Sequence, residues 1–173
     1  RIAVPFSIGR WMSSQSPDRS ASPEAPGAMA SPAVIGWREW VSLPALGIDW
    51  IKAKIDTGAR TSALHTFQLD VEHEHGSKVA RFGVHPFQRD SDTITWCSAS
   101  VVDERSVRDS GGHQEWRFVI ETPVRMAQRE WPIEITLTAR DTMLFRMLLG
   151  RTAMRYLRVD PLASFITGRP PEG

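Results

Sequence analysis

The sequence predicts a mostly β fold, a small closed or partly closed antiparallel barrel with one short helix near the C-terminus. Two observations support this fold class. Apolar residues recur at every second position in four separate segments, which is the period of a half-buried β-strand. By contrast, only one short stretch near the C-terminus favours a helix. With 173 residues, of which 41% are hydrophobic, the chain is long enough for one domain with a packed core.

Four alternating segments are the predicted strands. They cover residues 51–55, 67–71, 116–120 and 131–137. In the first segment, Ile51, Ala53 and Ile55 alternate with two lysines. In the third, Trp116 begins a run in which every second residue is apolar. We expect these apolar side chains to face the core and the intervening polar side chains to face solvent.

Turn and helix signals complete the predicted domain. Residues 109–112, Asp-Ser-Gly-Gly, lie between two strand-like runs and have the composition of a hairpin turn. The expected helix covers residues 151–157, directly after Gly150, and Pro161 limits how far it extends.

The two ends of the chain differ from this pattern. Residues 1–32 are rich in Ser, Pro and Ala, have no apolar period and contain several helix-breaking prolines. We expect a disordered tail there, a folded domain over residues 33–168, and a flexible C-terminal tail over residues 169–173.

Composition excludes several classes of function. The formal net charge is only +1, with acidic and basic residues interleaved, so nothing favours binding to nucleic acid or to an anionic membrane. No apolar run approaches the ~20 residues that span a bilayer, and the first ten residues lack a signal-peptide core. We therefore expect a cytoplasmic protein. The single cysteine, Cys97, excludes an intrachain disulfide and is more simply a buried apolar residue than a nucleophile.

The most informative motif is Asp-Thr-Gly-Ala at residues 56–59. An apolar strand ends at Ile55, so the carboxylate of Asp56 lies at a strand terminus, on a turn. Gly58 permits a tight backbone and leaves space for a substrate or a second chain, and Ala59 is small. The hydroxyl of Thr57 can tie the loop to a neighbour. Taken alone, so short a motif is more simply a turn without chemistry.

A second motif changes this interpretation. Leu148, Leu149 and Gly150 form an apolar strand that ends in glycine and leads into the expected helix. Retroviral-type aspartic peptidases carry an Asp-Thr-Gly-Ala loop and, later in the subunit, two large apolar residues and glycine that pack beneath it. The chain resembles these retropepsins in motif, order and length. The resemblance implies an acid-protease barrel with Asp56 as the catalytic carboxylate.

The resemblance extends to one bacterial and archaeal family, labelled ATP-dependent zinc proteases and also described as retropepsin-like. It covers residues 34–168 and is carried by segments 36–41, 52–65, 105–111, 137–143 and 148–153. Some members are associated with ATP-grasp ligases that add glutamate or other amino acids to proteins. This resemblance implies such a ligase as a possible partner.

The residues themselves do not explain the words "ATP" and "zinc". The chain has no phosphate-binding Gly-x-x-x-x-Gly-Lys-Ser/Thr loop and no His-Glu-x-x-His helix. In a strand, His73 and His75 would face the same side and share a metal, but a solvated pair is the simpler interpretation. His65 and His85 are equally suited to structural or substrate-lining roles, and His113 is expected to be exposed. We predict no metal and no cofactor.

Other residues are candidates for substrate binding. Arg60 follows the Asp-Thr-Gly-Ala motif, and Arg108 precedes the predicted turn that contains Ser110 and Gly111. A guanidinium can hold a substrate carboxylate, as in a glutamate-rich tail, although a solvated face or an ion pair is the simpler interpretation. The turn itself could be a flap over the substrate. Asp141 is followed two residues later by Met143 instead of glycine and is a poor second catalytic loop.

The predicted function is hydrolysis of a peptide or protein by two Asp56 carboxylates, one from each subunit of a homodimer. Because the chain supplies one such loop and the mechanism needs two, a symmetric dimer provides the second. Two alternatives remain open: a zinc-dependent peptidase, and a non-catalytic module that regulates an ATP-grasp ligase.

Overall fold

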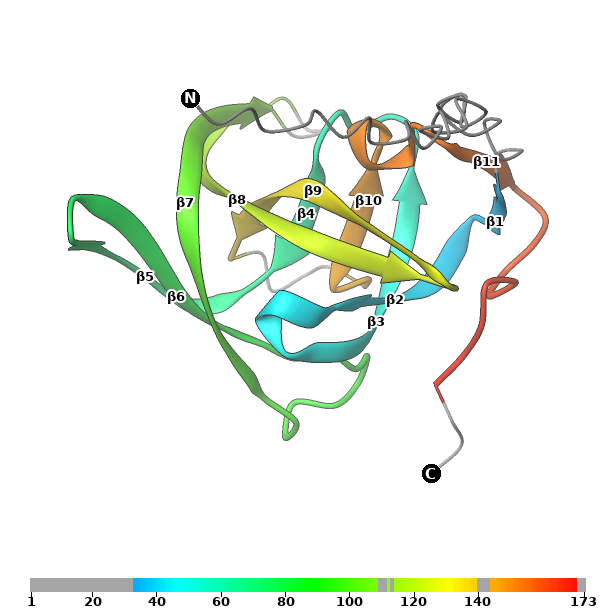
Figure 1. Ribbon diagram of the computed structural model, residues 1–173, viewed down its shortest axis with the longest axis horizontal. Helices are drawn as coiled ribbons and strands as arrows, with labels where there is room; N and C mark the ends of the chain where they lie inside the picture. Colours follow the sequence, from blue (N-terminus) through cyan, green and yellow to red (C-terminus); the bar gives the residue numbers. More distant parts are fainter. Residues whose placement is uncertain (1–32, 109–111, 113, 140–143, 171–173) are drawn as a thin grey trace, which may run out of the picture. The chain divides into compact units, whose positions relative to one another are not determined.

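The computed structural model describes residues 33–108, 112, 114–139 and 144–170 (Figure 1). The described residues form eleven strands and two short 3-10 helices. The strands are β1 (Ala33–Gly36), β2 (Arg38–Leu43), β3 (Ile48–Asp56), β4 (Ser62–His65), β5 (Phe67–Glu74), β6 (Ser77–Val84), β7 (Thr95–Arg108), β8 (Gln114–Met126), β9 (Arg129–Thr138), β10 (Met147–Gly150) and β11 (Leu157–Asp160). The helices are η1 (Pro44–Leu46) and η2 (Arg151–Met154). No helix in these ranges has the length and apolarity needed to cross a bilayer.

The strands form two sheets. The larger has the order β2-β3-β10-β4-β9-β8-β7-β6-β5, and β2 also pairs with β8 between Ser42 and Arg125. The smaller contains β1 and β11. The prediction of a mostly β fold is confirmed, but the prediction of antiparallel strands is wrong in part. The pairs β3–β10, β4–β9 and β1–β11 are parallel, so the fold is mixed.

One of these parallel pairs arises because β10 lies between β3 and β4 (Figure 1). It runs parallel to β3 and antiparallel to β4. Strand β10 follows β4 by about eighty residues in the sequence, so local turn signals do not reveal this insertion. The consequence is that two distant strand ends, Asp56 and Gly150, lie side by side.

The predicted helix at 151–157 is only partly correct. The helical turn ends at Met154, and Leu157 already begins β11, where it pairs with Ala33 of β1. Extended pairing with β1 therefore replaces the last helical turn before Pro161. A period-based argument cannot detect this, because the strand's partner lies more than a hundred residues away.

Alternation in β3 is confirmed, whereas in β9 the apolar residues are buried as expected but the intervening Thr136 is buried as well. Ile51, Ala53 and Ile55 are at most 7% exposed, and Ile133, Ile135 and Leu137 are buried as well. In the first half of β8 the predicted face is wrong. Trp116 is 74% exposed, whereas Arg117 is only 9% exposed.

The covered face of β8 changes along the strand. From Ile120 onwards the residues buried in the core include Ile120, Val124 and Met126. Before that point the opposite face is covered, and Arg117 and Val119 are buried. The β8–β9 register has no shift here, so β8 is itself regular, and the β-bulge between Val101 and Asp103 lies in its partner β7.

A C-terminal strap, residues 163–167, crosses the β1–β2 connection. The backbone N–H of Trp37 donates to the carbonyl of Ala163 at 2.9 Å, and the N–H of Phe165 donates to the carbonyl of Arg38 at 3.0 Å. The buried carboxylate of Glu39 accepts four hydrogen bonds, from the backbone N–H groups of Gly36, Ile166 and Thr167 and from the Thr167 hydroxyl. The strap is therefore an integral part of the folded domain.

Several predictions fall on residues outside this description. They are the disordered tail at 1–32, most of the turn at 109–112 with Ser110 and Gly111, the roles of His113 and Asp141, and part of the tail at 169–173. The strands beside the turn are described: β7 and β8 pair antiparallel up to Arg108 and Gln114.

Candidate active site

The Asp56 loop is held by its own backbone. Asp56 is the last residue of β3, and its Oδ1 accepts hydrogen bonds from the N–H groups of Gly58 and Ala59, each at 3.0 Å. A carboxylate held by two N–H donors has a fixed orientation. A Cβ at residue 58 would come within 3.2 Å of the same oxygen, so glycine keeps this contact open.

Strand β10 places the second motif directly beside this loop. Gly150 stands opposite Asp56 in the parallel register, and its N–H donates to the Ser62 hydroxyl at 3.1 Å. Leu149 is fully buried in the core, while Leu148 is half-buried and borders the loop's groove. The structure thus brings the two sequence motifs together.

Helix η2 binds the carbonyl groups of the loop. The backbone N–H of Arg151 donates to Ala59 and that of Thr152 donates to Arg60, at 2.9 and 3.1 Å. The Arg151 side chain adds two bonds of 2.9 Å from Nη1 to the carbonyls of Thr57 and Gly58. The sequence argument missed Arg151 and Thr152, although an arginine directly after Gly150 was a usable signal. The Thr57 hydroxyl makes no hydrogen bond within the described residues of the one chain, so its predicted role in holding the loop to a neighbour stays a prediction.

A groove of about 760 Å³ opens in front of Asp56. It is bordered by the loop, by β7 and β8 on one side and by β9 and β10 on the other. The lining residues that carry polar or charged side chains are Asp56, Arg60, Thr61, Arg105, Ser106, Arg108, Arg117, Thr136 and Thr138. The structure therefore places predicted Arg60 and Arg108 in the same groove as Asp56, and it adds residues of β7, β8 and β9 that sequence reasoning missed.

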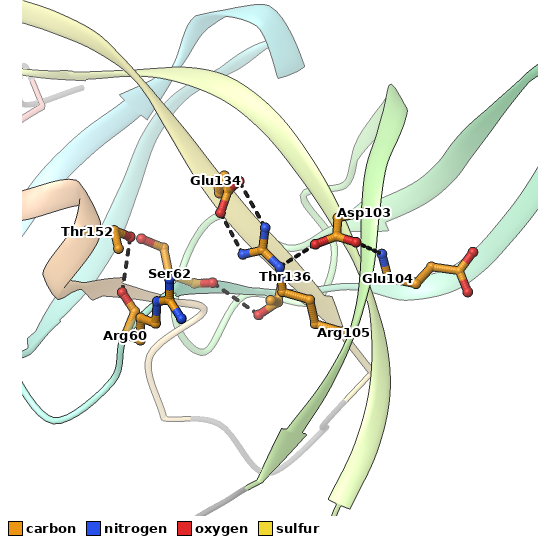
Figure 2. A network of polar contacts seen from close by, with 8 residues as sticks. All are labelled: Arg60, Ser62, Asp103, Glu104, Arg105, Glu134, Thr136 and Thr152. Atoms are coloured by element: carbon orange, nitrogen blue, oxygen red, sulfur yellow. Dashed lines mark hydrogen bonds and ion pairs between the residues drawn. The ribbon is translucent and has the colours of Figure 1, made fainter.

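One of the added arginines is already paired. Arg105 makes a bidentate contact with Glu134, at 2.6 and 3.0 Å, and its Nε donates to Asp103 at 2.5 Å (Figure 2). The hydrogen bonds from Glu134 and then Asp103 raise the pKa of Arg105. In turn, the Arg105 hydrogen bond lowers the pKa of Glu134 and that of Asp103. The positive charge of Arg105 is therefore already paired within the protein.

The other arginines differ in their pairing. Arg117 is held by Glu115, to which Nε and Nη2 lie at 3.0 and 2.9 Å. The side chains of Arg60 and Arg108 are exposed, and neither makes a salt bridge or side-chain hydrogen bond with any residue that the structure describes, although the charge of Arg60 contributes to lowering the pKa of Glu134. Positive charge is therefore available on both sides of Asp56, from the loop and from β7.

The remaining histidines lie apart from the groove lining. His73 is exposed on β5, but His75 lies in the following turn with φ of +47°, so the two do not continue one strand face as expected. His85 stacks on Phe67 with ring centroids 4.4 Å apart, and His65 is buried. Both of these side chains fit the structural interpretation. Over the described ranges, no group of three His, Cys, Asp or Glu residues is arranged to hold a metal ion.

Cys97 is buried as predicted. Its Sγ lies 3.4 Å from the carbonyl oxygen of Leu46, and burial raises its pKa to about 11. A thiol with so high a pKa stays protonated near neutral pH and is a poor nucleophile.

Comparison with known proteins decides the family. The model of the RimB-like family, described as retropepsin-like aspartic endopeptidase RimB, matches residues 34–170. The chain belongs to the RimB-like family. This confirms the retropepsin resemblance that Asp56 and Gly150 indicated, over nearly the same range of residues.

Curated relatives of this RimB-like chain are much longer proteins. It is 45% identical over 129 residues to a "Probable alpha-L-glutamate ligase" of Desulfotalea psychrophila, covering 74% of the chain and 28% of the relative. It is 42% identical over 136 residues to a protein of the same name from Shewanella pealeana, covering 78% and 30%. The chain thus spans less than a third of the length of these relatives.

A solved structure shows the same fold. Lpg0085 of Legionella pneumophila, a protein of unknown function, superimposes with a TM-score of 0.67 at 25% identity. The match covers 79% of the RimB-like chain and 99% of the Legionella chain.

Proposed function

We propose that this RimB-like chain is one subunit of a homodimeric aspartic endopeptidase with Asp56 as its catalytic carboxylate. The observation that carries the proposal is the position of Asp56. It ends a strand, faces an open groove, and has one oxygen fixed by the N–H groups of Gly58 and Ala59. Its second oxygen makes no hydrogen bond with the residues that the structure describes, and in the proposed reaction it acts on a water molecule.

The proposed reaction uses two Asp56 carboxyl groups that share one proton. The ionised carboxylate takes a proton from a water molecule, and the oxygen of that water attacks the scissile carbonyl carbon. The protonated carboxyl gives its proton to the carbonyl oxygen. The carboxyl that took the water's proton then gives it to the nitrogen, the other carboxylate takes a proton from one hydroxyl of the tetrahedral intermediate, and the C–N bond breaks to release the amine and the carboxylic acid. Like charges at close range disfavour double ionisation, which keeps one carboxyl protonated.

The groove supports a substrate that carries carboxylates. Arg60 and Arg108 have no ion-pair partner among the described residues, and their guanidinium groups line the groove that contains Asp56. A guanidinium binds a carboxylate through two parallel hydrogen bonds. Since the curated relatives are named alpha-L-glutamate ligases, a glutamate-containing peptide is the substrate we propose.

The decisive test is cleavage of a glutamate-rich peptide before and after exhaustive chelation. We expect hydrolysis that chelation leaves unchanged and that Asp56→Asn abolishes. Loss of activity that zinc alone restores would support the metal-dependent alternative. A peptide of the same length with glutamine in place of glutamate separates the charge requirement from general peptide binding.

A second candidate is a non-catalytic module that regulates a ligase. The observation in its favour is that the curated relatives contain the matching segment within a much longer chain named as a ligase. The experiment adds wild-type or Asp56→Asn protein to a glutamate ligase and follows glutamate incorporation. Equal regulation by both proteins, with no peptide cleavage by either, would favour this candidate over the peptidase.

A further inference from the structure

A threonine whose buried hydroxyl lacks a partner is part of the groove wall. Thr138 is the last residue of β9 and only 2% exposed. Its Oγ1 is shielded from solvent and makes no hydrogen bond in the described structure, while the residue forms part of the groove wall, where a change of χ1 rotamer exchanges the hydroxyl and the methyl group. A buried hydroxyl that lacks a partner destabilises a protein, so such groups are few in folded proteins and each requires an explanation.

Neighbouring groove residues do not have this property. Thr136, two residues earlier on β9, is equally buried, but its Oγ1 donates to the carbonyl of Ser62 at 3.0 Å. Ala63, opposite Thr136 on β4, is small and carries no polar side-chain atom. Together, Ala63, Thr136 and Thr138 form a side of the groove with one unused hydroxyl, which we call the Thr138 recess.

The recess lies to the side of the carboxylate. In the sheet, β10 and β4 separate β3 from β9. With a strand spacing of about 4.8 Å, the backbones of β3 and β9 are on the order of 14 Å apart. A peptide whose scissile bond lies at Asp56 therefore reaches Thr138 through one of its side chains and not through the bond that is cut.

We propose that Thr138 is a specificity-determining residue whose hydroxyl donates a hydrogen bond to the oxygen of a carboxylate or carboxamide side chain of the substrate. This inference rests on the proposed peptidase function. The Thr138 hydroxyl is the donor in the recess that has no partner. An apolar substrate side chain in the recess would exclude water and leave this hydroxyl unpaired. A site with a buried group that needs a partner rejects ligands that lack one.

The test compares peptides that differ at one position, with glutamate, glutamine or norleucine placed in turn at each position of a fixed sequence. Binding is measured with Asp56→Asn protein, which holds a peptide without cutting it, and cleavage is measured with the Asp56 protein. At one position we expect glutamine to be preferred over norleucine by about tenfold, the contribution of one buried hydrogen bond. If glutamate is preferred over glutamine at that position, the group bound by Thr138 is a carboxylate. If the two are equally preferred, the recess accepts the oxygen of a carboxylate or of a carboxamide.

Thr138→Val, which keeps the shape and removes the hydroxyl, is expected to abolish the preference at that position. Thr138→Ser keeps the hydroxyl and is expected to retain it. Thr122→Val is the matched control, because Thr122 is equally buried, its hydroxyl also lacks a partner in the described part of the chain, and it does not line the groove. Thermal unfolding of all three variants shows that they are folded.

The outcomes separate this inference from the proposed function. Selective binding that depends on Thr138, without cleavage by the Asp56 protein, would leave the recess intact and overturn the peptidase. Cleavage with the same glutamine-to-norleucine ratio in wild type and Thr138→Val would support the peptidase and overturn the recess. An equal change in the glutamine-to-norleucine ratio in Thr122→Val would also overturn the recess, since the effect would then not be local to the groove.

Discussion

Gly150 stands opposite Asp56 in the parallel register of β10 and β3, at a point where no side chain fits. A Cβ at residue 150 would lie 2.5 Å from the carbonyl carbon of Thr61 and 2.7 Å from its oxygen. These are backbone atoms of the chain that leaves the Asp56 loop, so they cannot move without moving the loop. Glycine is needed at residue 150 because β10 approaches the Thr61 backbone closely, and not because residue 150 has an unusual backbone angle.

We therefore expect Gly150→Ala to lower the free energy of unfolding by roughly 1–3 kcal/mol, as overpacking does in a close-packed interior. Peptide cleavage should fall as well, because the loop shifts. Gly58→Ala is the contrasting variant: its Cβ would meet only the Asp56 side chain, at 3.2 Å. It should reduce cleavage with a smaller change in the denaturation midpoint. Equal midpoints for Gly150→Ala and wild type would contradict this account of the packing.

Mixing experiments test the shared active site. Asp56→Asn keeps an oxygen that can accept the Gly58 and Ala59 hydrogen bonds, so the fold should be retained. When equal amounts of mutant and wild type exchange subunits, only about one quarter of the dimers keep two carboxylates, and activity should fall to that fraction. A fall to one half, with exchange shown independently by mass spectrometry, would mean that each chain works alone.

The Arg105 network predicts a dependence of stability on acid. Its hydrogen bond lowers the pKa of Glu134 in the folded protein. The stabilisation is therefore fully present above the ordinary carboxyl pKa of about 4.3 and is lost as pH falls through the lowered value. Urea unfolding of wild type and Glu134→Gln should differ near neutral pH and converge in acid. Glu130→Gln is a control, because Glu130 pairs with Arg125 on the exposed β8–β9 turn. A wild-type to Glu134→Gln gap that persists unchanged in acid would argue against this network.

Glu39 should be essential for holding the C-terminal strap. All four groups that donate to it in the described structure are backbone N–H groups or a hydroxyl. In Glu39→Gln an amide N–H₂ would face at least one of these donors, which should cost about 1–3 kcal/mol of stability. Hydrogen exchange at Ile166 and Thr167 should then accelerate more than exchange in β9. Uniform acceleration throughout the domain would instead indicate a global loss of stability.

The sequence was sufficient to predict the parts of the site that are formed by short motifs. Asp56 and Gly150 are each recognisable from a few adjacent residues, and their pairing followed from the family resemblance. The groove wall was not predictable in this way, because Arg105 is paired with Glu134, which is 29 residues further along the chain. The inward position of Arg117 was not predictable either, because the face of β8 that is covered at this point depends on the strands that pair with it and not on its own sequence.

The same reasoning explains the errors in topology. Antiparallel pairing was expected because turn signals join neighbours in sequence, whereas β10 inserts between β3 and β4 through contacts that are distant in sequence. The helix after Gly150 was expected to reach Leu157, but β1 supplies hydrogen-bonding partners that favour a strand from that residue. Both errors come from long-range pairing that overrides local preference.

The carboxylate of Glu39 joins Gly36 of β1 to Thr167 of the strap, so the polypeptide enters and leaves the described fold within a few residues of one side chain. A unit whose entry and exit points adjoin can be inserted into a host protein or fused to it without a long connecting segment and without strain on its interior. The relatives that carry the matching segment as less than a third of their length are consistent with such modular use. Insertion or fusion of the domain would leave the Asp56 groove undisturbed, since the junctions lie at the strap and β1 and not at the residues that line the groove.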